Sequence, residues 1–396
     1  MNKRLWIYIG VLGFTAITYN SIARVSAVEP PPAPPIYERS IVFQGGGFST
    51  AVALGMLEGV RSKGYYPDLI IGTCGGAIAA SIAQVLPDSE DQKKFLESHL
   101  VHEELKSIHL SKDKHLFRAI GLLEKVMTAG LWKTIPDFFS DYIINVPAEL
   151  PLQEIQKPFQ VGSATTPAVV IVAAQMQFGP DSQGQKFVRG GSYKETYFTD
   201  PGTAQLISNF PSPIGQQYSR SYVSPSTEVI TDTTLSLAAR ASITDNYLMR
   251  PSELEGHYYM TGGIDLFPIE LARLLSRETA MPFGEALSNP VFETEFSIAF
   301  GFSDIDRLKH VTSQFADYWI DSTDQIEALS SEDLNPGLNL SKGVLVEGVP
   351  EDYDKYVKDV EAMWNYGFER GAESIRASKN DKTHVRNKTK YNWSGN

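Results

Sequence analysis

The chain of 396 residues contains a single cysteine, Cys74. One cysteine excludes an intrachain disulfide and any zinc site built from cysteine ligands. The seven histidines are scattered along the chain, with no His-Glu-x-x-His segment. The sequence therefore predicts no bound metal.

Positive charge is also in short supply. Lysine and arginine number 35 against 47 acidic residues, which leaves a formal net charge of −12. No basic stripe interrupts the part of the chain that looks folded, so we expect no nucleic-acid partner. The length and the hydrophobic content of 42% suit one large α/β domain or two smaller ones with a sizeable core.

A long hydrophobic run is missing too. The apolar run at the N-terminus extends from Leu5 to about Tyr19, short of the roughly 20 residues that a membrane span needs. Lys3 and Arg4 precede it, and small residues ending at Ala27 follow it, which is the order of a secretory signal. Residues 1–27 are therefore predicted to be a signal peptide. The protein would be exported to the periplasm or secreted, or tethered to the membrane if the segment stays as a signal anchor.

The rest of the chain divides by composition. A proline-rich stretch at residues 28–38 predicts a stiff spacer. The folded domain is expected at residues 39–310, followed by a helical region at 311–378 packed on it. An apolar and aromatic stripe in that region predicts core packing, with a membrane-surface face as the alternative. Residues 379–396 are polar and net basic and are expected to be disordered.

The most informative stretch follows a short apolar run at residues 69–71. That run stops at Gly72, and a series of small residues begins at Gly75, which predicts a buried strand that turns sharply into a close-packed helix. Cys74 stands at the apex, with Gly72 and Gly76 two residues to either side. Glycines at these places tolerate the tight turn of a nucleophile elbow, whose apex usually holds serine.

A second strand–turn–helix unit precedes the elbow. The β-rich run at residues 39–44 is followed at once by Gly45, Gly46 and Gly47, and then by apolar residues at helical spacing. Two such units in succession predict parallel strands, with the amides of the glycine triplet beside the elbow at the carboxyl ends of the strands. Further strands are predicted at residues 169–174, 193–198, 258–260 and 296–302, and a helix at residues 233–242.

These segments resemble the patatin-like phospholipase family. Its members carry an oxyanion loop Gly-Gly-Gly-x-Arg/Lys-Gly, an elbow Gly-x-Ser-x-Gly and a later Asp-Gly-Gly/Ala. The corresponding segments here are Gly45-Gly46-Gly47-Phe48-Ser49-Thr50, Gly72-Thr73-Cys74-Gly75-Gly76 and Thr261-Gly262-Gly263, with further similarity from Ala238 through Ser242 to Pro251. The resemblance spans about Arg39 to Ser276. It implies an α/β fold, a three-layer sandwich with a mostly parallel central sheet and helices on both faces.

The resemblance also implies a chemistry, and the sequence departs from it at the reacting positions. Family members hydrolyse acyl esters of phospholipids or other lipids without metal or organic cofactor: the serine attacks, the aspartate takes its proton and the loop amides bind the oxyanion. Here Cys74 occupies the nucleophile position and Thr261 the aspartate position. A threonine hydroxyl does not act as a base near neutral pH, so a general-base factor of about 10²–10⁴ has to come from elsewhere. Asp265 is an alternative base, and His257 a weaker one.

Two hypotheses follow for Cys74. In the first, the helix dipole stabilises a Cys74 thiolate, which needs less help from a base than serine does, and a nearby carboxylate would disfavour it. In the second, the protein has kept the fold and lost the reaction, and it binds lipid or a protein partner with Cys74 as a small buried apolar residue. A phospholipid or other lipid acyl ester is the predicted ligand, and a membrane surface is a further candidate partner.

Overall fold

The structure is a computed structural model in which the chain divides at Pro34, so that Pro35–Asn396 forms a unit of its own. The description below concerns that unit alone. The predicted signal segment and most of the proline-rich spacer lie outside the described residues. The structure describes residues 36–45, 49–107, 109–110, 128–140, 142, 144–163, 165–246, 248–284, 290–332, 337–339, 344–346 and 348–385.

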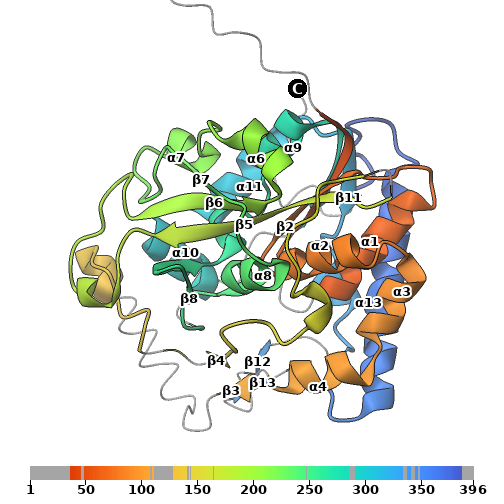
Figure 1. The fold of residues 1–396 in the computed structure, drawn as a ribbon, viewed down its shortest axis with the longest axis horizontal. Helices are drawn as coiled ribbons and strands as arrows, with labels where there is room; N and C mark the ends of the chain where they lie inside the picture. The colour runs from red at the N-terminus through yellow and green to blue at the C-terminus, as the bar shows by residue number, and fades with distance from the viewer. Residues whose placement is uncertain are drawn as a thin grey trace, which may run out of the picture. The chain divides into compact units, whose positions relative to one another are not determined.

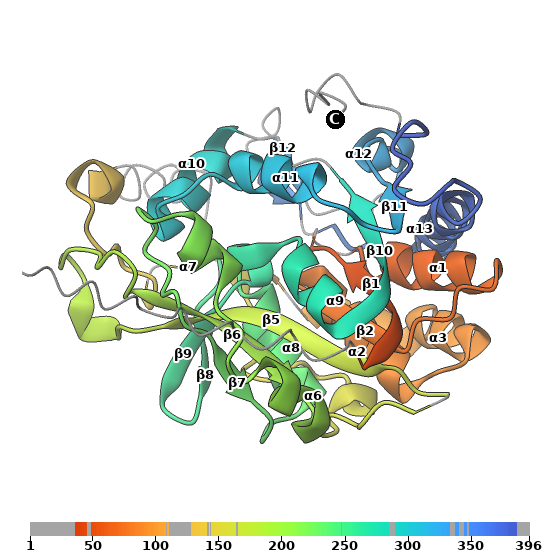
Figure 2. The ribbon, with the colours of Figure 1, turned by 90° about the horizontal axis from the view of Figure 1, so that it is seen from above.

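Within the described residues, the main sheet has nine strands. Seven of them follow one path in the order β11 (Tyr318–Asp321), β10 (Ser276–Phe283), β1 (Tyr37–Phe43), β2 (Leu69–Thr73), β5 (Ala168–Met176), β6 (Tyr193–Thr199) and β7 (Glu228–Ile230). A hairpin of β8 (Ser252–Leu254) and β9 (His257–Met260) joins this path through β9, which pairs with β5 (Figures 1 and 2). Neighbours from β11 to β5 are parallel, and β5 is antiparallel to both β6 and β9. The prediction of a mostly parallel sheet is confirmed.

Helices cover both faces of this sheet (Figure 2). One face packs against α1 (Thr50–Arg61), α2 (Gly75–Val85), α8 (Leu235–Ile243) and α13 (Tyr353–Ser374). The other packs against α6 (Pro201–Ile207), α7 (Pro213–Gln217), α9 (Ile269–Leu275), α10 (Pro290–Phe300) and α11 (Asp304–Ser313). Along β1, Ile41 and Phe43 belong to the first core and Val42 to the second, because side chains alternate between the faces of a strand. The predicted three-layer sandwich is confirmed.

The remaining described elements are short or lie outside these layers. They are α3 (Ser89–Leu96), α4 (His99–Ser107), α12 (Gln325–Ala328), the strand pair β3 (His109–Leu110) and β4 (Ile144–Asn145), and the strand pair β12 (Gly337–Asn339) and β13 (Val344–Val346). Helix α3 begins at the N-cap Asp88, whose carboxylate accepts the amides of Glu90 and Asp91.

Helices α1 and α13 pack backbone against backbone. The contact is made by Gly55 and Gly59 in α1 and by Gly367 and Gly371 in α13. A Cβ atom added at any of the four would lie between 2.0 and 2.3 Å from a carbonyl oxygen of the other helix; at Gly59 that oxygen belongs to Phe368. The apolar stripe of α13 is buried in this contact, which supports core packing for it rather than a membrane-surface face.

The structure corrects three expectations of secondary structure. Residues 296–302, predicted as a strand, mostly belong to helix α10, whose buried Phe296, Ala299 and Phe300 share one face at spacings of three and four. Strand β10 was not predicted, since the charged pair Arg277 and Glu278 follows its first residue and it contains a proline. Residues 311–378 are not only helical, because β11 lies in that range and extends the main sheet.

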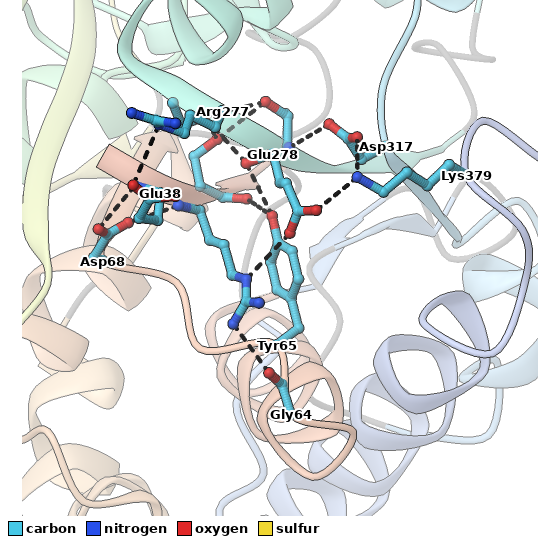
Figure 3. A network of polar contacts seen from close by, with 12 residues as sticks. Glu38, Gly64, Tyr65, Asp68, Arg277, Glu278, Asp317 and Lys379 are labelled. Atoms are coloured by element: carbon cyan, nitrogen blue, oxygen red, sulfur yellow. Dashed lines mark hydrogen bonds and ion pairs between the residues drawn. The ribbon is translucent and has the colours of Figure 1, made fainter. Parts of the chain in front are cut away.

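Residues 379–385, the first seven of the segment expected to be disordered, contact the main sheet and its core in the structure. The Nζ atom of Lys379 lies 2.6 Å from Oε1 of Glu278 and 3.1 Å from Oδ1 of Asp317 (Figure 3). Val385 is buried in the second core. The segment 379–385 looks like a solvated tail because the carboxylates that pair with it come from β10 and from the residue preceding β11, far away in the sequence.

Candidate active site

The elbow between β2 and α2 holds Cys74 in a strained conformation. Its φ is 50° and its ψ is −125°, and it caps the N-terminus of α2. Residues other than glycine rarely adopt positive φ, and such strain is concentrated at functional sites. The Cys74 side chain is half-buried, so part of it reaches solvent. This is the backbone arrangement of a nucleophile elbow.

Both elbow glycines have a steric reason in the structure. A Cβ atom at Gly72 would lie 2.6 Å from the carbonyl oxygen of Gly76, and one at Gly76 would lie 2.2 Å from the carbonyl oxygen of Phe43. The turn therefore closes so tightly that helix α2 touches the end of β1, and no larger residue fits at either place.

Ser242 of helix α8 connects the elbow to strand β5 by two hydrogen bonds. The amide of Cys74 donates to Oγ of Ser242 over 2.8 Å, and that hydroxyl donates to the carbonyl of Val172 in β5 over 2.6 Å. Ser242 is fully buried. The sequence included it in the segment that resembles the family, but nothing there indicated that it contacts the elbow.

The glycine-rich loop passes directly beside the cysteine. A Cβ atom at Gly45 would lie 2.6 Å from Cβ and 3.4 Å from Sγ of Cys74. Gly46 and Gly47 lie outside the described residues. Thr50, at the start of α1, donates from Oγ1 to the carbonyl of Gly75 over 3.5 Å, which ties the end of the loop to the first residue of α2.

The Thr261 hydroxyl is engaged by the backbone. The residue after Thr261, Gly262, lies against the elbow: a Cβ atom at Gly262 would come within 2.7 Å of the Cys74 amide nitrogen. The Oγ1 atom of Thr261 accepts the amide of Gly263 over 2.8 Å and caps the short 3-10 helix Gly262–Asp265. The side chain at the family's aspartate position therefore has a local structural role.

Asp265, the alternative base, is held in a buried ion pair. Nε of Arg307 donates to its Oδ1 over 3.1 Å and Nη2 to its Oδ2 over 2.9 Å, and both side chains are almost fully buried. Burial raises the pKa of Asp265, and Arg307 opposes that shift. Arg307 also pairs with Glu270. With both carboxylate oxygens bound to a guanidinium, Asp265 is placed to support the fold rather than to serve Cys74.

His257 is exposed at the start of β9. Thr261 follows the other end of that strand, so the rise per residue places the histidine about 10 Å or more from the turn beside the elbow. The position fits a hairpin residue in contact with solvent.

Two acidic residues beside the Thr261 turn were not anticipated. Asp245 directly follows the residue whose carbonyl accepts the Thr261 amide, and Glu295 precedes Phe296, whose ring lies 3.8 Å from where a Cβ on Gly263 would stand. Burial raises the pKa of Asp245 to about 6, and burial together with the Asp245 charge raises the pKa of Glu295 to about 8. The Asp245 side chain is itself exposed, so the raised pKa comes from the protein packed around its carboxylate and not from an enclosed side chain. No motif in the sequence marks either residue.

A cavity of about 520 Å³ lies at the other edge of the sheet, lined by Glu38, Arg39, Arg277, Glu278 and Lys379. These residues stand at the start of β1 and β10 and after α13, whereas Cys74 follows the carboxyl end of β2. Its cations are each paired with a carboxylate: Arg39 with Glu278 over 3.1 Å, Arg277 with Glu38 over 3.2 Å and Lys379 with Glu278. This network ties the first strand to its neighbour and to the C-terminal segment.

Among the described residues, no three or more histidine, cysteine, aspartate or glutamate side chains are grouped so that they could hold a metal ion. The part of the chain that the structure describes also contains no helix with the length and apolar character needed to span a bilayer.

Comparison with known proteins agrees with the geometry. The sequence model described as patatin-like phospholipase matches residues 41–273, a range that includes the glycine-rich loop, the elbow and the Thr261 turn. No curated protein matches the chain. Among solved structures, the crystal structure of VipD from Legionella pneumophila is similar at 11% identity and a TM-score of 0.32, covering 88% of this chain and 68% of that chain.

Proposed function

The chain belongs to the patatin-like phospholipase family, and from that premise we propose that it cleaves acyl esters of phospholipids or other lipids with Cys74 as the nucleophile. The observation that carries this proposal is the backbone of Cys74, with φ at 50° and a half-buried side chain at the junction of β2 and α2. Holding a non-glycine residue there costs about 1–3 kcal/mol. The strain has a use if the side chain must project from the turn toward a substrate.

The chemistry follows from the groups around the sulfur. The N-terminus of α2 favours the thiolate form of Cys74. The Cys74 thiolate forms a bond to the ester carbonyl carbon, the bond to the alcohol oxygen breaks, and the alcohol leaves with a proton taken from solvent water. Water then releases the fatty acid from the thioester and regenerates the thiolate. We propose that backbone amides of Gly45, which lies against Cys74, and of the first turn of α2 bind the developing oxyanion.

Thr261 does not serve as the general base in this proposal, because its hydroxyl already accepts a backbone amide. We propose Asp245 as the group that takes a proton from the attacking water. Its position beside the Thr261 turn and a pKa raised to about 6 both suit a general base near neutral pH.

The decisive measurement is release of fatty acid from a phospholipid and from a short-chain chromogenic ester. We expect turnover by the wild type and a loss of about 100-fold or more for Cys74→Ala, since the covalent step disappears. The double variant Cys74→Ser, Thr261→Asp rebuilds the family dyad and is expected to be active, whereas Cys74→Ser alone lacks its base. Equal turnover by wild type and Cys74→Ala would refute Cys74 as the nucleophile.

The role of Asp245 is tested separately. Asp245→Asn should lower turnover by about 10²-fold and remove the rise in rate around pH 6, because the base of that pKa is gone. Asp232→Asn changes an exposed aspartate ahead of α8 and serves as the matched control. A pH profile that stays unchanged in Asp245→Asn would rule out this assignment while leaving Cys74 untouched.

A second candidate function is lipid binding without turnover. Two contacts favour it. The hydroxyl of Thr261 accepts a backbone amide, and the carboxylate of Asp265 is paired with Arg307, so neither side chain is available as a base for Cys74. Thiol labelling separates the two functions. Fast labelling of Cys74 at pH 6 supports the nucleophile, and labelling only after denaturation, together with no fatty acid release, supports the binding protein.

A further inference from the structure

An exposed apolar cluster lies away from the elbow. The exposed fractions of its three side chains are 82% for Leu131, 67% for Trp132 and 61% for Val188. Single exposed apolar residues are ordinary, but a cluster that includes tryptophan marks a surface that meets an apolar partner. Below, these residues together with Lys133, Lys186 and Arg189 are called the Trp132 surface.

The two segments of the Trp132 surface are paired by backbone hydrogen bonds. The amide of Ile135 donates to the carbonyl of Gln185 over 2.8 Å, and the amide of Phe187 donates to the carbonyl of Lys133 over 3.1 Å. Phe187 points inward, where it is 8% exposed and stacks on Tyr222 at 4.5 Å between ring centroids. Its neighbours in sequence therefore point outward from an ordered scaffold.

The charge of this surface differs from that of the chain as a whole. Lys133, Lys186 and Arg189 are all exposed beside the apolar side chains, while the whole chain carries a formal net charge of −12. Tryptophan favours the boundary between headgroups and acyl chains, and lysine and arginine favour anionic headgroups. The combination fits a bilayer with anionic lipids better than it fits a purely apolar protein surface.

The Trp132 surface lies at the edge of the sheet that carries the elbow. Both Cys74 and the loop that contains Val188 follow carboxyl ends, those of the parallel neighbours β2 and β5, and the short helix at residues 128–132 lies beyond the end of β5 (Figure 1). Helix α10 links the two places: a Cβ on Gly130 would lie 2.6 Å from Ile298, and Phe296 of the same helix faces the Thr261 turn.

We propose that the Trp132 surface docks the protein on an anionic phospholipid bilayer, with Leu131 and Trp132 inserted among the headgroups. The docking proposal rests on the proposed function. Docking through the Trp132 surface would bring a lipid surface to the edge of the sheet that holds Cys74, where the proposed hydrolysis takes place.

The test is cosedimentation of the full chain with phosphatidylcholine vesicles that contain or lack phosphatidylglycerol. Wild type should bind the anionic vesicles more tightly, and added salt should weaken that binding. Leu131→Ala and Trp132→Ala should each weaken it by about tenfold, because buried apolar area is lost. Lys133→Gln and Arg189→Gln should each weaken it by about fivefold.

Matched controls come from the opposite edge of the sheet. Tyr66 is 64% exposed in the turn before β2, and Lys63 is exposed next to it. Tyr66→Ala and Lys63→Gln should bind like wild type, and every variant keeps the same N-terminal segment. Failure of the wild type to bind anionic vesicles, or an equal loss in Tyr66→Ala and Trp132→Ala, overturns the proposal.

Two further readouts separate docking from catalysis. Cys74→Ala should keep full vesicle binding, so a failure of the proposed reaction leaves this test intact. In the other direction, Trp132→Ala should slow release of fatty acid from vesicles and leave hydrolysis of a soluble short-chain ester unchanged. An equal loss on both substrates would contradict a docking role.

Discussion

The backbone amide of Cys74 is bound by a hydroxyl from another helix. Ser242 accepts the Cys74 amide and donates to the Val172 carbonyl, so one buried side chain satisfies a donor on the elbow and an acceptor on β5. Buried backbone groups that lose their partners are costly, and here the loss falls on a residue whose backbone is already strained.

We predict that Ser242→Ala lowers the free energy of unfolding by about 1–3 kcal/mol, because an elbow amide and a strand carbonyl are left unsatisfied. It should also change the labelling rate of Cys74. Ser236→Ala removes a buried hydrogen bond from the same helix to the Leu150 carbonyl and is the control. Thermal unfolding and thiol labelling measure both effects. An unchanged labelling rate in Ser242→Ala would show that the hydroxyl does not position the cysteine.

Glu195 is the second residue with an exceptional environment. It is fully buried in β6, where the Tyr197 hydroxyl donates to Oε1 and the Ser212 hydroxyl to Oε2, each over 2.7 Å. Burial, and next to it the Asp265 charge, raises the pKa of Glu195 to about 8. The ordinary pKa of an unfolded glutamate is about 4.3. Between these values the folded protein keeps a proton that the unfolded chain has released.

Linkage gives the sign of the resulting pH dependence. Since the folded state binds more protons in this window, the contribution of Glu195 to stability is full below about pH 4 and is lost progressively as the pH rises toward 8. Glu195→Gln removes this titration. Between about pH 5 and pH 8 the free energy of unfolding should therefore fall further in wild type than in Glu195→Gln, and the two falls should differ by more than about 1 kcal/mol. Denaturant unfolding measures it, with Glu228→Gln, a more exposed partner of Lys194, as control. Parallel curves for wild type and Glu195→Gln would contradict the raised pKa.

At the scale of elements, the contact of α1 with α13 is made by glycines on both helices. Glycine inside a helix is ordinarily destabilising, so its replacement by alanine ordinarily stabilises by about 0.5–1 kcal/mol. Here the sign reverses, since the added methyl group would overlap a carbonyl oxygen of the facing helix. The close approach lets α13 cover α1, the helix that directly follows the glycine-rich loop.

We predict that Gly59→Ala destabilises the protein by about 1–3 kcal/mol, because its Cβ would stand 2.2 Å from the Phe368 carbonyl and the helices must move apart. Asn365→Ala on the exposed face of α13 should be neutral or slightly stabilising. Denaturant midpoints compare the two. A stabilised Gly59→Ala would mean that the helices separate at no cost.

At the scale of the whole folded unit, the sheet joins parts of the chain that are far apart in sequence. The first strand lies between β2 and β10, and the edge strand β11 is followed by a segment that returns to it. The side-chain oxygen Oδ1 of Asn380 accepts from Nε1 of the buried Trp319 over 3.0 Å, and the backbone amide of Asn380 donates to the Asp317 carbonyl over 2.8 Å. Its φ of 55° is one that asparagine tolerates better than most residues do.

Two substitutions separate backbone from side chain at Asn380. Asn380→Gly keeps the positive φ and removes the acceptor of the Trp319 indole, so we predict a loss of about 1–3 kcal/mol. Asn380→Asp keeps an acceptor and should stay near wild type. Thermal unfolding followed by tryptophan fluorescence measures both. Equal stability of Asn380→Gly and wild type would show that the C-terminal segment does not secure the edge strand.

The corrections above have one cause in common. Residues 296–302 are rich in residues that favour strands, yet their burial at spacings of three and four follows from the sheet face against which they pack. Strand β10 reads as a charged and proline-containing stretch, but it becomes a strand because β1 and β11 pair with it on either side. Long-range pairing of this kind is invisible to local propensity.

The sequence by itself determined the elbow, the glycine-rich loop and the order of strand–turn–helix units. Each of these features depends on local backbone conformation, which glycine spacing and apolar periodicity indicate. The sequence also determined that Cys74 and Thr261 stand where the family has serine and aspartate. Only the tertiary structure decided what the side chains meet. Asp265 is paired with Arg307, which lies 42 residues away, and Cys74 is secured by Ser242, which lies 168 residues away. Such partners are selected by the packing of distant helices on one sheet, and no short pattern in the chain encodes them.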